Sequence, residues 1–189
     1  MNLRELMDKF EIKNKGNLVT KEFFIEEKFE SDLGELTIEE ATSHALSCDT
    51  FLAHSSSDID LISKIIEYFI NKLNAKPYID KDDMELPKTT SPKTASLLIG
   101  NIEACKKFII VVTDNSINSK WVPWELGIAN ASKKYNDVAV LQIEGKEVDG
   151  ECKDNEYLGI NNQIRQRSGE LIVYNPDTEK SISINEWLK

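Results

Sequence analysis

The sequence FIIVV at residues 108–112 and the sequence WVPWEL at residues 121–126 together decide the fold of this chain. Five apolar residues in a row are typical of a strand that is buried on both faces, as the strands of parallel sheets are. In the second segment Trp121 and Glu125 are four residues apart, so on a helix their side chains lie on one face. In open α/β sheets, a unit of strand, polar turn and helix binds ligands at the carboxyl end of the strand. An aromatic ring beside a carboxylate at that place suits a ligand with a flat ring and a sugar.

From Cys48 onward, the pattern of a strand, a turn and a helix repeats along the chain. Four further apolar runs predict short strands, at residues 50–53, 77–79, 138–141 and 171–174. Apolar side chains at helical spacing predict amphipathic helices at residues 62–73 and 95–102. Ser57 is the expected N-cap of the first of these helices. Because strands alternate with helices, we expect an α/β fold with a central five-stranded parallel sheet and helices on both faces.

The first 47 residues differ from the rest of the chain in their charged, amphipathic character. Apolar side chains recur there at a helical period, at Leu3, Leu6, Met7 and Phe10. The segment FFI at residues 23–25 fits a strand as well as a helix. We therefore predict two parts, a mostly helical N-terminal extension over residues 1–47 and a main domain over residues 48–189.

Composition and charge disfavour several classes of function. The 189-residue chain has 33 acidic and 23 basic residues and a net charge of −10, so it would repel nucleic acid. No run approaches the roughly 18 apolar residues of a membrane helix. The N-terminal sequence MNLREL is too charged for a signal peptide. We expect no nucleic acid partner, no membrane association and a place in the cytoplasm.

The chain has 3 cysteines, Cys48, Cys105 and Cys152, and 2 histidines. The number of cysteines is odd and no C-x-x-C pattern occurs, so the sequence predicts neither a disulfide framework nor a metal site. Cys105 ends a helical apolar pattern, which favours a small buried residue. Nothing near it in the sequence supports a nucleophile.

A polar connection over residues 81–93 follows the predicted strand that Asp80 ends. It contains two prolines and a Thr-Thr-Ser run, which are typical of a loop. Loops of this length inside compact α/β domains are often functional, although a surface excursion without a role would have the same composition.

Four segments in order resemble the motifs of TIR domains, the Toll/interleukin-1 receptor homology family. Residues 49–58, DTFLAHSSSD, resemble the first-strand motif, and residues 78–80, YID, with the loop after them resemble the second strand and the BB loop. Residues 108–116 resemble the third strand and its exit, and residues 121–125 resemble the W-x-x-x-E segment of TIR enzymes. The resemblance spans residues 48–145 and implies a flavodoxin-like TIR fold.

The resemblance implies one of two functions. Many TIR domains of bacteria and plants, and some of animals, cleave NAD+ at the bond between nicotinamide and ribose, whereas others are non-catalytic adaptors that only associate. The His-Ser-Ser form of the first motif is similar to that of stand-alone bacterial members, several of which serve anti-phage systems such as Thoeris. A flavodoxin-like binder of another nucleotide is a third hypothesis, which requires the resemblance to be superficial.

For an enzyme, the resemblance makes Glu125 the catalytic residue. Nicotinamide leaves as a neutral molecule, so the reaction needs no general acid but benefits from a carboxylate beside the oxocarbenium-like ribose. The resemblance further implies four residues that bind the substrate, His54, Ser55, Trp121 and Asp80. The residues alone allow other roles. Glu125 in the first turn of a helix could serve only the helix dipole, Trp121 could anchor the core, and Asp80 could cap its strand.

NAD+ is then a substrate, and we expect no cofactor and no metal ion. The product would be ADP-ribose, a cyclic isomer or a base-exchange product. In bacterial immunity, the product could activate a separate effector protein, or the reaction could serve to deplete NAD+. TIR enzymes commonly assemble to complete the site. The resemblance therefore also implies self-association, which we expect through residues 81–93 and the neighbouring face.

Overall fold

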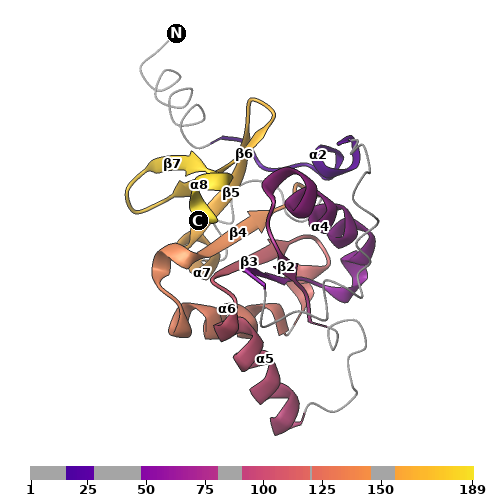
Figure 1. Cartoon of the computed structure of the whole chain (residues 1–189), viewed down its shortest axis with the longest axis vertical. Coiled ribbons are helices and arrows are strands. Elements are labelled where there is room, and N and C mark those ends of the chain that lie inside the picture. The colour runs from indigo at the N-terminus through magenta and orange to yellow at the C-terminus, as the bar shows by residue number, and fades with distance from the viewer. Residues whose placement is uncertain (1–15, 28–47, 81–90, 120, 146–155) are drawn as a thin grey trace.

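The computed structural model describes residues 16–27, 48–80, 91–119, 121–145 and 156–189, and every structural statement below concerns these residues. A sheet of seven strands forms the centre (Figure 1). Its strands lie in the order β2 (Pro77–Tyr78), β1 (Thr50–Ala53), β3 (Lys107–Val112), β4 (Val138–Gln142), β5 (Asn162–Arg167), β6 (Glu170–Asn175) and β7 (Lys180–Ser183). The first five strands in this order run parallel, and β6 and β7 continue the sheet as antiparallel strands.

Helices cover both faces of the sheet. One face carries α2 (Lys21–Ile25), α4 (Ile59–Leu73) and α8 (Ile184–Trp187). The other face carries α5 (Pro92–Ala104), α6 (Trp121–Ser132) and α7 (Glu156–Gly159). Successive strand residues point to opposite faces, so Leu52 joins the core under α4 whereas Phe51 joins the core under α5 and α6.

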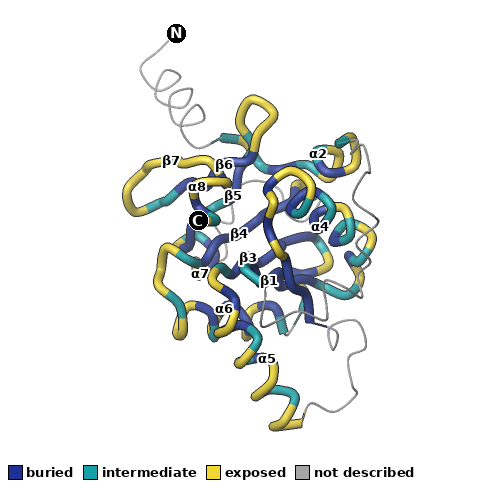
Figure 2. The backbone as a smooth tube through the Cα atoms, viewed as in Figure 1, coloured by how far each residue is buried: buried dark blue, intermediate teal, exposed yellow. Residues whose placement is uncertain are grey.

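β1, β3 and β4 form the buried centre of the sheet, as the dark segments in Figure 2 show. Every residue of β1 and β4 is buried, and in β3 only Lys107 is partly exposed. Phe51 and Phe108 occupy paired positions of β1 and β3, and their rings stack with centroids 5.5 Å apart. The prediction that residues 108–112 form a strand buried on both faces is confirmed.

The parallel sheet of five strands is confirmed, but its fifth strand is not the one predicted. Residues 171–174 belong to β6, which pairs antiparallel with β5. The fifth parallel strand, β5, has the polar sequence NQIRQR, in which Ile164 is the single apolar residue. A polar side chain of β5 serves the structure directly, since the Asn162 amide donates to the backbone oxygen of Val138 at 3.0 Å. Because its side chains are mostly polar, this strand has no apolar run that would predict it.

The segment before α2 joins the sheet at the ends of β4 and β5. Asn17 forms an antiparallel bridge with Gln166, and Val19 forms a parallel bridge with Ile143. Gly16 has a φ of +75°, and a Cβ atom there would lie 2.9 Å from the backbone oxygen of Gln166. Only glycine therefore fits this close approach without strain.

The FFI segment at residues 23–25, which the sequence left open between a strand and a helix, belongs to the helix α2. Phe24 is fully buried, and the rings of Phe23 and Phe24 lie 5.2 and 5.5 Å from that of Tyr68 on α4. These aromatic contacts hold the N-terminal segment against the main sheet. The predicted helical residues 3–10 lie outside the described residues, and the domain boundary after residue 47 stays a prediction.

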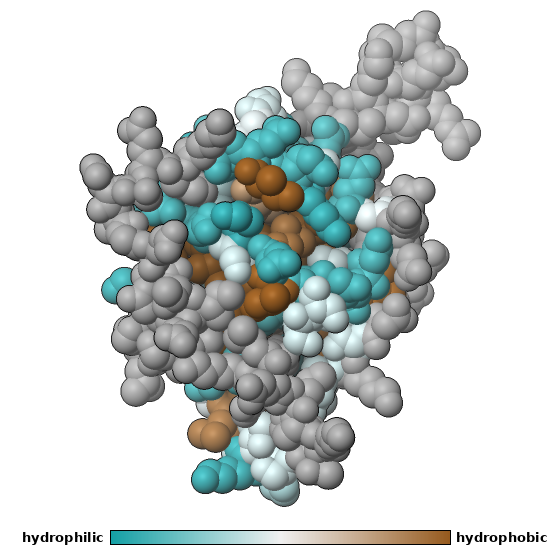
Figure 3. All heavy atoms as spheres, turned by 90° about the vertical axis from the view of Figure 1, so that its right-hand side faces the viewer, coloured by the Kyte–Doolittle hydropathy of each residue, from teal (hydrophilic) through white to brown (hydrophobic). Residues whose placement is uncertain are grey.

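Figure 3 shows the face of the molecule that carries α2 and α4. Among the described residues visible on it, hydrophilic side chains surround several hydrophobic ones. Ile25 of α2 is 60% exposed, and single apolar residues of this kind are ordinary on the surface of a folded protein. Within the described ranges, no helix combines the length and the apolar character that crossing a bilayer requires.

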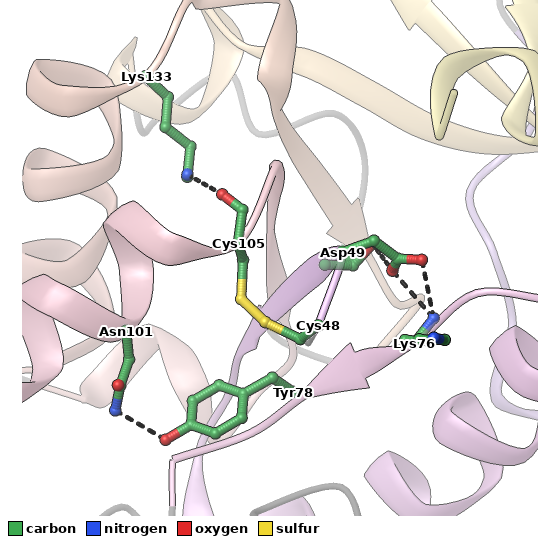
Figure 4. The surroundings of a disulfide bond; sticks show 8 residues. Cys48, Asp49, Lys76, Tyr78, Asn101, Cys105 and Lys133 are labelled. Carbon is green, nitrogen blue, oxygen red and sulfur yellow. Dashed lines mark hydrogen bonds between the residues drawn. A yellow bond between two sulfur atoms is a disulfide. The ribbon is translucent and has the colours of Figure 1, made fainter. Parts of the chain in front are cut away.

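Cys48 and Cys105 form a disulfide bond, so the prediction that the chain has no disulfide is wrong (Figure 4). The register of the sheet explains the pairing. Thr50 on β1 pairs with Lys107 on β3. Cys48 stands two positions before Thr50, and Cys105 stands two positions before Lys107. The two Cα atoms are therefore only 5.5 Å apart. The count and spacing of cysteines carry no information on this register, and Cys152 lies outside the described residues.

Replacing Cys48 by serine should lower the free energy of unfolding by about 2–4 kcal/mol, because the bond restricts the unfolded chain. The constraint acts across a sequence separation of 57 residues. Urea unfolding of the oxidised protein, followed by tryptophan fluorescence, measures the difference. The matched control is Cys152→Ser, which removes a cysteine that is not in this bond. Equal unfolding midpoints for wild type and Cys48→Ser under oxidising conditions would contradict the prediction.

Candidate active site

The carboxyl ends of the parallel strands bring the predicted site residues to one edge of the sheet. From β1 the chain passes to β2 on one side and then crosses to β3 on the other. The connections thus diverge between β1 and β3, which is where open α/β sheets bind ligands. His54 directly follows β1, and Thr113 directly follows β3. The pairing of Ala53 with Ile110 places both strand exits at this edge.

His54 is a buried, neutral imidazole at this edge. It is 2% exposed, and its Nδ1 lies 3.2 Å from the backbone oxygen of Leu52. A carbonyl oxygen only accepts, so Nδ1 carries the proton and donates it. Burial lowers the pKa of His54 and outweighs that hydrogen bond and the negative charge of Asp58, which both raise it. The other ring nitrogen, Nε2, has no hydrogen-bond partner among the described residues, so it can accept a hydrogen bond from a ligand.

A 3₁₀ turn, η2 (Ser56–Asp58), connects β1 to α4. The hydroxyl of Ser55 accepts from the backbone nitrogen of Ser57 at 3.4 Å and caps this turn. The prediction that Ser57 caps the helix is therefore wrong. The turn moves the start of α4 to Ile59 and leaves Ser57 exposed within the turn itself. Ser55 stands next to His54 at the edge where the sequence placed it.

Asp80 lies at the same edge, on the other side of β1. Tyr78 of β2 pairs with Phe51 of β1. Asp80 stands two residues after Tyr78, as Ala53 stands two residues after Phe51. Asp80 is 9% exposed, so its carboxylate is largely withdrawn from the surface. Asp80 therefore stands two residues beyond the end of β2, the strand that pairs with β1.

Glu125 lies on the inward face of α6. The buried residues of this helix form one stripe, at Val122, Glu125, Leu126 and Ala129. The three apolar members belong to the core between α6 and the sheet, and Glu125 is 0% exposed. A carboxylate at a core position lowers stability, and positions that break the core pattern in this way are candidates for function.

The start of α6 corrects one expectation about Glu125. Trp121 begins the helix, so Glu125 is its fifth residue, and the first turn contains no acidic residue. The prediction that Glu125 stands in the first turn, where the helix dipole acts most strongly, is wrong. Pro123 falls inside the first turn instead, where its missing N–H breaks no helical hydrogen bond.

Trp121 and Trp124 share the first turn of α6. Their ring centroids are 5.4 Å apart and the ring planes stand at 81°. Trp121 is partly buried and packs against the core under α6, as its interpretation as a core anchor requires. Trp124 is 37% exposed. Contact of Trp121 with a ligand stays a prediction.

A polar cluster that the sequence did not predict joins the exits of β1 and β3. Its members are Asp58, Thr113, Asn115 and Ser116. Asp58 accepts a hydrogen bond from the Thr113 hydroxyl at 2.5 Å and another from the Asn115 amide at 2.6 Å. Asp58 and Thr113 are 55 residues apart in the sequence, so no local sequence pattern indicates their contact. Only the pairing of β1 with β3 could have indicated it.

The mostly parallel sheet, with helices on both faces and connections that diverge between β1 and β3, defines an α/β protein of the flavodoxin-like class. Residues 49–156, more than half of the chain, match the family model described as TIR domain, and the chain belongs to this family. The resemblance seen in the four sequence motifs is thus confirmed.

Two named relatives are similar to this chain. A stretch of 148 residues is 29% identical to the protein named Probable 3' cyclic ADP-D-ribose synthase ThsB' of Bacillus cereus (strain MSX-D12) and covers 75% of each chain. A stretch of 107 residues is 35% identical to a protein of Cytobacillus dafuensis that has the provisional name cyclic ADP-D-ribose synthase TIR2. This second match covers 55% of the chain but only 27% of that protein, so the two proteins are similar over this part and not over their full lengths.

The burial of His54 predicts a pH dependence of stability. The pKa of His54 in the folded protein lies below the ordinary value of 6.5. At a pH between these two pKa values, His54 therefore binds a proton only in the unfolded chain. The free energy of unfolding should therefore be highest above pH 6.5 and should fall as the pH drops toward the folded pKa.

Urea unfolding at about pH 7.5 and about pH 5 tests this dependence. The comparison variant is His54→Asn, because an asparagine amide can replace the Nδ1 donor without titrating. Wild type should lose more stability on acidification than the variant. An equal or larger loss in His54→Asn would contradict the argument.

Proposed function

We propose that this chain cleaves the bond between nicotinamide and ribose in NAD+ and forms a nucleotide of the ADP-ribose type. The observation that carries the proposal is the carboxylate of Glu125, which is fully buried on the inward face of α6. A buried carboxylate at the ligand edge of an α/β sheet supports a role in stabilising charge. The two relatives named as cyclic ADP-D-ribose synthases support the substrate, since cyclic ADP-ribose contains the atoms of NAD+ without its nicotinamide.

In the proposed reaction the bond between C1′ of the ribose and the pyridinium nitrogen breaks, and its electron pair leaves with nicotinamide. Nicotinamide becomes neutral as it leaves, so no proton donor is needed. The ribose gains positive charge, which the Glu125 carboxylate would stabilise. Attack by water gives ADP-ribose and a proton, attack by a nucleophile of the same molecule gives a cyclic isomer, and attack by another base gives an exchange product.

The other site residues would hold the substrate. Nε2 of His54 is buried and can accept a hydrogen bond from a ligand hydroxyl or amide. Ser55 and the backbone N–H groups of the turn after β1 stand where a diphosphate can meet the start of a helix. Asp80 would bind the sugar or the loop beside it, and the ring of Trp121 would stack on the nicotinamide.

The names of the relatives favour a cyclic ADP-ribose product over simple hydrolysis. Such a product would be a signal that activates a separate effector protein in bacterial antiviral defence, whereas hydrolysis would deplete NAD+. Either role places the protein in the cytoplasm. Thiols are generally kept reduced there, so the Cys48–Cys105 bond would form only under oxidising conditions.

Glu125→Gln should lower kcat for nicotinamide release by about 100-fold or more, because the amide keeps the shape of the carboxylate but not its charge. The assay is nicotinamide release from NAD+ by concentrated protein, with the products separated by mass. Glu103→Gln, at an exposed position on α5, is the matched control. Turnover at the wild-type rate by Glu125→Gln would refute the mechanism. If wild type releases no nicotinamide but binds another TIR-bearing chain tightly, the alternative of a non-catalytic adaptor takes its place.

Self-association is the second part of the proposal, through TIR–TIR contacts that include residues 81–93 and the adjoining surface of α5. Residues 81–90 lie outside the described residues, and residues 91–93 are exposed at the start of α5. Leu97, one turn further along α5, is 56% exposed. A large apolar side chain at the surface of a helix is suited to a protein contact.

Leu97→Glu should weaken the assembly by about tenfold or more, because it puts a charge in place of an apolar side chain at the contact. Light scattering and nicotinamide release, both measured over a range of protein concentrations, test this. Ile25→Glu on α2, at a position that is 60% exposed, is the matched control. A wild-type protein that is strictly monomeric and fully active would contradict the role of assembly.

A further inference from the structure

Asp58 is a buried carboxylate that its own helix does not use. It is 7% exposed and immediately precedes α4, yet its side chain makes no capping hydrogen bond to that helix. Both carboxylate oxygens are bonded to the exit of β3 instead. Oδ2 accepts from the hydroxyl of Thr113 at 2.5 Å, and Oδ1 accepts from the amide of Asn115 at 2.6 Å. An aspartate at the start of a helix usually caps it, whereas here it joins two loops by short, charge-assisted hydrogen bonds.

Thr113 is the centre of a second set of hydrogen bonds. It is 2% exposed. Besides donating to Asp58, its Oγ1 accepts from the backbone nitrogen of Asn115 at 3.2 Å and from that of Ser116 at 3.1 Å. Its own backbone nitrogen donates to Ser116 Oγ at 2.7 Å. One hydroxyl group therefore fixes the chain directly after β3 in a single turn.

A 3₁₀ turn, η3 (Ser116–Asn118), connects this set to α6. The backbone nitrogen of Ser119 donates to the backbone oxygen of Ser116 at 3.0 Å. The hydroxyl of Ser119 then accepts from the backbone nitrogens of Trp121 at 3.2 Å and Val122 at 3.4 Å. A continuous series of hydrogen bonds thus runs from the start of α4 to the first turn of α6.

The residue at which α6 begins decides where Glu125 points. Each residue of an α-helix turns by about 100°, so a chain that entered the helix one residue out of register would carry the carboxylate off the inward stripe. Pro123 does not fix the start by itself, since proline is accepted at any position of a first turn whose N–H groups have no helical partner. The hydrogen bonds around Ser119 do fix it, and they depend on the turn that Thr113 and Asp58 hold.

We propose that Asp58 and Thr113 are positioning residues for NAD+ cleavage, because the hydrogen bond between them fixes the start of α6 and so aims Glu125 at the substrate. The inference rests on the proposed function, in which Glu125 is the catalytic residue. Neither positioning residue touches the substrate. Breaking the hydrogen bond between Asp58 and Thr113 would leave a buried carboxylate with one donor fewer, which is unfavourable. The folded protein therefore keeps this bond.

Thr113→Val and Thr113→Ser are the matched pair that tests the bond. Valine keeps the shape of threonine but lacks the hydroxyl, whereas serine keeps the hydroxyl. Thr113→Val should lower kcat for nicotinamide release by about 10- to 100-fold with KM nearly unchanged, since a reacting group displaced by ~1 Å costs a rate factor of this size. Thr113→Ser should stay within about threefold of wild type. Wild-type kcat in Thr113→Val, or a raised KM with kcat unchanged, would overturn the proposal.

Asp58→Ala tests the other side of the same bond. Asp60→Ala is its control, because Asp60 is an exposed carboxylate in the first turn of the same helix. Asp58→Ala should lose kcat as Thr113→Val does, and Asp60→Ala should keep it. The double variant Asp58→Ala/Thr113→Val should lose less than the sum of the two single losses, because the hydrogen bond between Asp58 and Thr113 is removed by either substitution. Additive losses would show two independent effects and overturn the proposal.

Asn115→Ala keeps the proposal testable if Thr113→Val does not fold. The Asn115 side chain is exposed, so its removal leaves the core intact, yet it takes away one of the two donors to Asp58. We expect kcat to fall by about three- to tenfold, the range that one hydrogen bond represents. Asn115 holds the second oxygen of the Asp58 carboxylate, so its loss lets that carboxylate turn away from Thr113, and an unchanged kcat would overturn the proposal.

Amide hydrogen exchange separates this inference from the proposed function. The backbone N–H groups of Trp121 and Val122 should exchange faster in Thr113→Val than in wild type, and at the wild-type rate in Thr113→Ser, whatever the substrate is. If wild type releases no nicotinamide, the proposed function fails, and the exchange rates alone decide whether Thr113 fixes the start of α6. Unchanged exchange in Thr113→Val would overturn the positioning role even in an active enzyme.

Discussion

The parallel pairing of β1 with β3 is the constraint on which the rest of the structure depends. Its register runs from Thr50 opposite Lys107 to Ala53 opposite Ile110 and joins segments that are far apart in the chain. At the amino ends, the register sets the two disulfide cysteines opposite each other. At the carboxyl ends, it sets the loop after β1 against the loop after β3, where the buried polar cluster forms. The site is therefore a consequence of strand pairing and not of any one local motif.

The apolar sheet makes it possible to bury polar groups at its carboxyl edge. The polar residues buried there or on the helix that follows β3 include His54, Asp58, Asp80, Thr113, Ser116 and Glu125. Each would lower stability if it stood alone in an apolar interior. β1, β3 and β4 offset this cost because they are buried almost throughout. Stabilising a developing charge requires such a place, in which polar groups are already positioned and little water screens them.

The sequence predicted well what depends on local burial. Residues 108–112 form the buried strand, and the helices stand where their apolar spacing placed them. Prediction failed where a partner distant in the chain decides the outcome. The polar strand β5 is held by its neighbours, and Cys48 pairs across the sheet. Within the site, the family pattern indicated Glu125 and His54, but a 3₁₀ turn displaced the expected cap at Ser57, and no spacing in the sequence shows which loops meet.

The two halves of the carboxyl edge differ in the segments that are bonded to them. Backbone groups of Asn17 and Val19 are hydrogen bonded to Gln166 and Glu144 at the ends of β5 and β4, so the N-terminal segment closes that half of the edge. The residues that we propose to bind the substrate follow β1 and β2 or lie on α6 after β3, and none follows β4 or β5. The connections between strands diverge at β1 and β3, which is where an opening for a ligand arises in this class of sheet. Residues 17–19 therefore lie at the half of the edge that the proposed site does not use.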